Sequence, residues 1–187
     1  MIRLLKTITP LYLAIFLSGC SSVALMSAPI IGYSQRSISP KATKEQQQQV
    51  KQEVMQLLEK EYKQPFKLES FEYKYQTHNR PGSFDFSQYG SYYFKVQAPD
   101  NPIIVMDFRI DDINKSSTNE LIEDFKKRQL KSVYCAAFPA YYRQSIANKT
   151  KVLQPYTKQT EKFCDSRNQT SFHSPRNYYL KHQDEYK

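Results

Sequence analysis

The hydrophobic period of the chain changes at Pro65, and this change constrains the fold more than any other feature. Before Pro65 the period is helical, and Thr43 with Gln46 forms a capping box that begins a helix. Pro65 ends the helix, because proline cannot continue one. After Pro65 the period is two, which is typical of strands. The apolar positions of the helix are Val50, Val54, Leu57, Leu58 and Tyr62.

Three segments after Pro65 alternate between apolar and polar residues. In the first, the phase changes between Leu68 and Phe71, which predicts a bulge near Ser70. The turn at residues 99–102 joins the other two segments into an antiparallel hairpin. Its inward residues are expected to be Tyr92, Phe94, Val96, Ala98, Ile104, Met106, Phe108 and Ile110, opposite outward Tyr93, Lys95 and Gln97.

Together these elements predict an α+β domain over residues 43–165. An N-terminal helix packs on an antiparallel sheet of at least three strands, and helices follow. Ser117 with Glu120 opens the first of these, and Pro139 is expected to interrupt the next. The element order resembles the cystatin-like architecture, in order alone. Residues 166–187 are polar, so we expect a loosely ordered tail.

The start of the chain is typical of a secretory leader. Arg3 and Lys6 precede a short apolar core at residues 11–17, too short to span a bilayer, which takes about 20 residues. The next residues complete the sequence Leu17-Ser18-Gly19-Cys20, which resembles a bacterial lipobox. The alternative is an uncleaved helix from Ile8 to Ile31, which two prolines and a polar patch disfavour.

The lipobox resemblance implies a location. Residues 1–19 would be removed as a signal peptide, Cys20 would be acylated, and residues 20–42 would tether the domain to the membrane. In that family an aspartate after the cysteine commonly signals retention in the inner membrane. Ser21 stands here instead, so we expect the outer membrane, facing the periplasm, rather than the inner membrane or the cell surface.

Two cysteines remain after Cys20. In an oxidising compartment Cys135 and Cys164 are expected to pair. The alternative is a reactive thiol beside a histidine, for which the sequence offers His78, His173 and His182 without choosing among them.

A candidate binding surface lies between the first two strands and on the second. The segment from Thr77 to Gly90 is predicted to be a long aromatic loop that either binds another molecule or folds back over the sheet. The surface comprises Arg80, Phe84, Phe86, Tyr89, Tyr93 and Lys95. Its rings and cations suit an envelope protein or a glycan, whereas an envelope location argues against nucleic acid as partner.

Basic residues exceed acidic residues by 27 to 18, and removal of the leader takes only two of the 27. This excess indicates either attraction to an anionic partner such as lipid headgroups, or a well-hydrated surface. We favour the interpretation as a well-hydrated surface, because the sequence has only one dense cluster of basic residues, at residues 126–128.

Catalytic signatures are missing from the sequence. It has no Gly-rich phosphate loop, nucleophile elbow or His-Glu metal helix. Asp107, Asp111 and Asp112 are expected to solvate a strand end rather than bind calcium, and we expect no metal or cofactor. The favoured function is therefore an envelope lipoprotein that acts as a binding or assembly module. The alternative is an envelope hydrolase whose catalytic residues the sequence does not identify.

Overall fold

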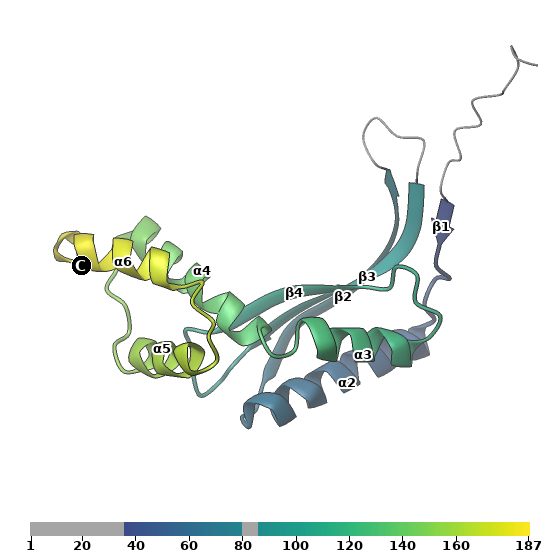
Figure 1. Ribbon diagram of the computed structural model, residues 1–187, viewed down its shortest axis with the longest axis horizontal. Coiled ribbons are helices and arrows are strands. Elements are labelled where there is room, and N and C mark those ends of the chain that lie inside the picture. The colour runs from purple at the N-terminus through teal and green to yellow at the C-terminus, as the bar shows by residue number, and fades with distance from the viewer. Residues whose placement is uncertain (1–35, 80–85) are drawn as a thin grey trace, which may run out of the picture. The chain divides into compact units, whose positions relative to one another are not determined.

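The computed structural model describes residues 36–79 and 86–187, and Arg36–Lys187 forms one compact unit. It confirms the α+β class (Figure 1). The strands are β1 (Arg36–Ile38), β2 (Lys67–Asn79), β3 (Phe86–Gln97) and β4 (Val105–Asp111). The helices are α2 (Lys44–Tyr62), α3 (Thr118–Arg128), α4 (Val133–Asn148), α5 (Tyr156–Ser166), α6 (His173–His182) and the short 3₁₀ helix η1 (Gln183–Glu185).

Strand β3 lies at the centre of the sheet. Antiparallel β2 pairs with it along its whole length, from Phe86 to Gln97. The opposite edge is shared, because antiparallel β4 pairs with residues 91–97 and parallel β1 with residues 86–88. The predicted hairpin of the second and third strands is confirmed, as is the bulge, which lies between Leu68 and Ser70.

The predicted element order is wrong at its start, because β1 precedes the first helix. Ser39, just after β1, is also buried, so the packed domain begins at Arg36 rather than at residue 43, within the expected tether. A three-residue strand is too short to show a period. It also pairs with β3, about fifty residues further along the chain. This pairing is parallel, so the prediction of a purely antiparallel sheet is wrong.

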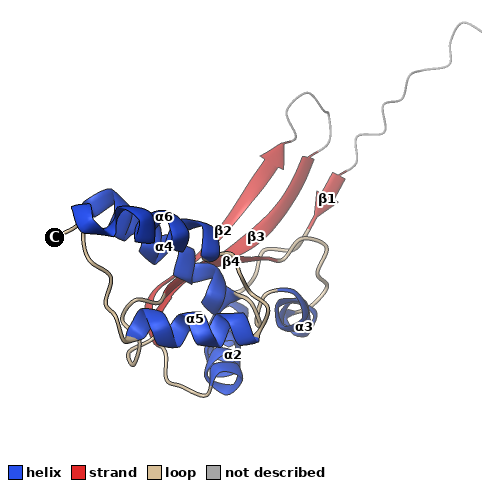
Figure 2. Ribbon diagram, turned by 60° about the vertical axis from the view of Figure 1, so that its left-hand side comes forward, coloured by secondary structure: helices blue, strands red, loops and turns tan. Residues whose placement is uncertain are grey.

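Helices α2 and α3 cover one face of the sheet (Figures 1 and 2). The inward residues predicted for β3 and β4 are all buried there. The rings of Phe94 and Phe108 stack with centroids 5.1 Å apart, and the ring of Phe125 in α3 stacks on Phe108 at 5.7 Å. The capping box of Thr43 and Gln46 is present as predicted. The strand alternation and the helix start were therefore readable from the sequence.

The predicted loop from Thr77 to Gly90 is mostly strand. Strand β2 continues to Asn79 and β3 begins at Phe86, in regular register with each other. Polar residues at the hairpin end concealed this continuation, since they do not alternate with apolar ones.

The C-terminal part of the chain is ordered, which corrects the prediction of a loose tail. Helix α6 follows residue 166, and Phe172, Tyr179 and Tyr186 are each at most 6% exposed. The rings of Phe138 and Phe172 lie 5.0 Å apart, which packs α6 on α4. The domain therefore extends to residue 187 instead of ending at residue 165. Residues that pack through isolated rings show no period, so the sequence pattern did not reveal them.

The predicted disulfide joins Cys135 of α4 to Cys164 of α5. A link across 29 residues stabilises the folded state by about 3 to 4 kcal/mol in the chain-entropy model. The prediction that Pro139 interrupts a helix is wrong, because Pro139 lies inside α4. The buried neighbours Phe138 and Tyr142 hold the helix together at this point. Among the described residues, no helix is long and apolar enough to cross a membrane.

Candidate functional site

The structure separates the predicted binding residues between the two faces of β3. Tyr89, Tyr93 and Lys95 share the face that α2 and α3 leave uncovered, which we call the open face. Phe86 has the parity of buried Tyr92 and therefore belongs to the covered face. Arg80 and Phe84 lie outside the described residues. Part of the predicted surface is thus brought together, on strands rather than on a loop.

The two tyrosines of the open face are held by contacts that sequence analysis did not identify. The ring of Tyr89 stacks on the imidazole of His78, with centroids 4.0 Å apart and planes inclined by 11°. The Lys74 ammonium lies 5.1 Å from the ring centroid of Tyr93. The electrostatic interaction with the hydroxyl of Tyr93 raises the pKa of Arg109 further above its usual value, which places the Arg109 side chain near this ring. These contacts hold both rings in place while leaving them half-exposed.

The cations of the open face are balanced by carboxylates. Lys74 pairs with Glu72 at 3.0 Å, and Arg109 pairs with Asp111 at 3.0 Å. Lys95 lies opposite Asp107 in the strand register. The positive surface expected from the sequence is therefore a mixed one. Such a face suits a neutral or mixed-charge partner better than a polyanion.

Asp112 is buried at 7% exposure, which corrects the expectation that it solvates a strand end. The backbone N–H of Gly90 donates to its Oδ1 at 2.7 Å, and the nearby hydroxyl of Tyr73 favours the charged carboxylate. Burial raises the pKa of Asp112 above its ordinary value. The alternation of Phe108 and Ile110 already gave Asp112 the inward parity, so the signal was in the sequence.

The segment between β1 and α2 is fastened around Asp112. The hydroxyl of Ser39 donates to the Asp112 carbonyl at 3.1 Å, and the hydroxyl of Tyr75 donates to the Ser39 carbonyl at 2.8 Å. The N–H of Ala42 donates to the hydroxyl of Tyr73 at 2.9 Å. The adjoining cavity measures about 60 Å³, which holds a few water molecules at most. The backbone carbonyl of Asp112 and the hydroxyls of Tyr73 and Tyr75 therefore hold the start of the domain against the sheet.

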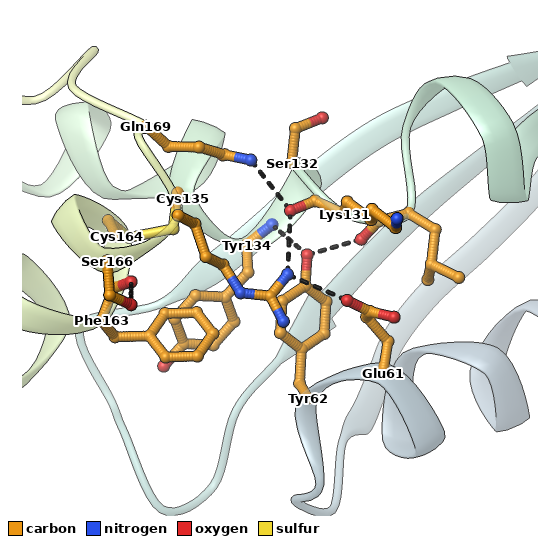
Figure 3. A network of polar contacts seen from close by, with 12 residues as sticks. Glu61, Tyr62, Lys131, Ser132, Tyr134, Cys135, Phe163, Cys164, Ser166 and Gln169 are labelled. Atoms are coloured by element: carbon orange, nitrogen blue, oxygen red, sulfur yellow. Dashed lines mark hydrogen bonds and ion pairs between the residues drawn. A yellow bond between two sulfur atoms is a disulfide. The ribbon is translucent and has the colours of Figure 1, made fainter.

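A second polar cluster joins α2 to the C-terminal helices (Figure 3). The guanidinium of Arg167 donates to Glu61 at 2.9 Å and lies 4.8 Å from the ring centroid of Phe163. The hydroxyl of Tyr62 donates to the Leu130 carbonyl at 2.6 Å and accepts from the N–H of Tyr134. Burial raises the pKa of Tyr62 to about 12, so it stays protonated at neutral pH. Each of these groups is used to hold helices together.

A cavity of about 340 Å³ adjoins this cluster, between α2, α4, α5 and the turn before β4. At its base the amide of Asn101 donates to the hydroxyls of Tyr134 and Thr160, at 2.9 and 2.7 Å. The Oδ1 of Asn101 has no hydrogen-bond partner among the described residues, but it is itself shielded from solvent. Asn101 therefore ties the turn to two helices, and its free acceptor is not open to a ligand.

The described residues do not form the reactive-thiol site or the metal site that the sequence analysis considered. Cys135 and Cys164 are both fully buried and joined to each other, which excludes the reactive-thiol alternative in this structure. Within residues 36–79 and 86–187, no group of three His, Cys, Asp or Glu residues is placed to hold a metal ion. No protein-family model, curated protein or solved structure matches the chain.

Proposed function

We propose that this chain is a membrane-anchored lipoprotein of the bacterial cell envelope that binds another envelope component, a protein or a glycan, through its open face. The observation that carries the proposal is the pair of half-exposed rings, Tyr89 and Tyr93, which contact His78, Lys74 and Arg109 on the face that α2 and α3 leave uncovered. Fixed aromatic rings bury much apolar area at little entropic cost, which makes them effective binding residues.

Export is supported by the disulfide and by the leader. The Cys135–Cys164 bond is of the kind that persists in an oxidising compartment. The lipobox at Leu17–Cys20 supports anchoring at Cys20, which lies outside the described residues. Two or three acyl chains give stable attachment, at about 0.8 kcal/mol per buried methylene. Anchoring also confines the open face near other envelope components, so a modest affinity suffices.

The anchor is tested at the mature N-terminus. Mass spectrometry of protein extracted from membranes is expected to find an acylated Cys20 as the first residue. A Cys20→Ala variant should remain uncleaved or leave the membrane fraction. A chain that keeps residue 1, or a Cys20→Ala variant that still matures and stays attached, would overturn the anchor.

The binding face is tested by photocrosslinking in living cells. A photoreactive residue at position 89 or 93 is expected to capture a distinct envelope component. The matched control positions are 48 and 52, which are exposed glutamines on α2. The same capture pattern from both sets would overturn the binding face. Substrate turnover by the purified chain, abolished by one substitution in a cleft, would replace the proposal with the hydrolase.

A further inference from the structure

Strand β2 is a long, accessible edge strand. It runs for 13 residues, and none of them is buried, whereas its neighbour β3 has a row of buried residues. Its backbone pairs with β3 on one side, and no other described residue pairs with the opposite side. Alternate N–H and C=O groups along that side are therefore available to another strand.

The side chains of β2 favour such a strand on both faces. On the covered face Phe71, Tyr73 and Tyr75 form a row of half-buried rings beside the edge. On the open face Glu72 and Lys74 carry opposite charges on either side of Tyr73. Tyr73 is also the midpoint of the strand, which extends six residues in each direction.

We propose that two copies of this chain pair through antiparallel β2 strands, with a two-fold axis at Tyr73. Residues opposite each other in an antiparallel pair share a face, so the axis must pass through a residue position. With Tyr73 on the axis, Glu72 lies opposite Lys74 of the other copy, twice. Phe71 lies opposite Tyr75 in the same way, so the two aromatic rows extend each other.

The neighbouring registers are less favourable. An axis at Glu72 places two carboxylates directly opposite each other, and an axis at Lys74 places two ammonium groups together. Only the register centred on Tyr73 matches both charges. The exposed charges that discourage random pairing of this edge thus complement a second copy of the same strand.

The dimer joins two four-stranded sheets into one continuous sheet. The two-fold axis is perpendicular to that sheet, so both open faces lie on the same side. Tyr93 and Lys74 lie close to the axis in each copy, because Tyr93 is on the strand next to β2. The dimer therefore presents two copies of the open face side by side to one partner.

The register is tested with single cysteines in the purified full-length chain, kept in detergent. Ser70 and Gln76 are exposed, share the open face and lie opposite each other in the proposed dimer. We expect a mixture of differently tagged Ser70→Cys and Gln76→Cys chains to form a mixed disulfide under mild oxidation. Either variant alone should not, since six residues of strand separate equal positions by about 20 Å.

The pairing of Glu72 with Lys74 of the other copy is tested by charge-reversing substitutions in the same crosslinking assay. Glu72→Lys or Lys74→Glu should each lower the yield of mixed disulfide at least fivefold. Exchanging both in one chain should restore it, and equal melting temperatures confirm that each variant is folded.

Two results would overturn the dimer. One is equal crosslinking of all combinations, and the other is no mixed disulfide at any protein concentration. The test needs no envelope partner, so its outcome is separate from that of the proposed function.

Discussion

The two faces of the sheet are built from alternate residues of the same strands, yet they differ in composition and surroundings. On the covered face Phe94 and Met106 are at most 1% exposed and pack under α2 and α3. On the open face Tyr93 and Lys95 are half-exposed or exposed, and nearby charges form ion pairs. The covered face thus contributes most to the stability of the domain, whereas the open face is available for the proposed binding.

The largest expected effect is a difference in the free energy of unfolding between substitutions at two neighbouring residues of β3. Phe94→Ala should lower the free energy of unfolding by about 3 to 5 kcal/mol, because it leaves a cavity between stacked rings. Tyr93→Ala, one residue away on the open face, should lower it by less than about 1 kcal/mol. Urea unfolding of both variants measures the difference. Equal losses would contradict the distinction between the faces.

Gly90 tests how closely the covered face is packed. A Cβ at this position would lie 2.2 Å from the hydroxyl oxygen of Tyr73. Gly90→Ala should therefore displace that ring from Ala42 and Asp112 and lower the free energy of unfolding by about 1 to 3 kcal/mol. The control is the same substitution in a Tyr73→Ala chain. There the added loss should largely vanish, and an unchanged loss would refute the proposed clash.

Asp112 tests the cost of a charge on the covered face. Its pKa is raised by burial, so the folded state binds the proton more tightly than the unfolded state. Protonated Asp112 stabilises the folded state fully at pH values below its pKa in the unfolded chain, near 3.8. This stabilisation is lost as the pH rises through the higher pKa of Asp112 in the folded state. The stability of Asp112→Asn relative to the native chain should therefore improve as pH rises from about 3.5 to 7. Urea unfolding across that range checks this, and a pH-independent difference would contradict it.

Lys95 gives the smallest expected change in stability. It is exposed on the open face, and Lys95→Ala should change the free energy of unfolding by less than about 0.5 kcal/mol. Crosslinking from position 93 should nevertheless decrease in this variant, because a cation beside the rings is lost. A Gln52→Ala variant on α2 serves as the control for both measurements. Unchanged crosslinking from position 93 would remove Lys95 from the binding face.

The covered face was predictable because burial imposes a period. The alternation from Tyr92 to Ile110 and the first helix both follow from it, and the disulfide follows from the count of cysteines. Strand β1 and the polar end of the hairpin have no such period, since tertiary pairing with β3 holds them. The contacts of Tyr89 with His78 depend on the register of β2 against β3, which the sequence does not specify.

The most direct test of the binding face is tyrosine labelling in intact cells compared with the purified chain. Tyr93 should react in the purified chain and be protected in cells, where the partner covers it. Tyr178 on α6 is 53% exposed and is the internal control, with equal labelling expected in both samples. Equal labelling of Tyr93 and Tyr178 in cells and in purified protein would contradict the claim that the open face binds an envelope component.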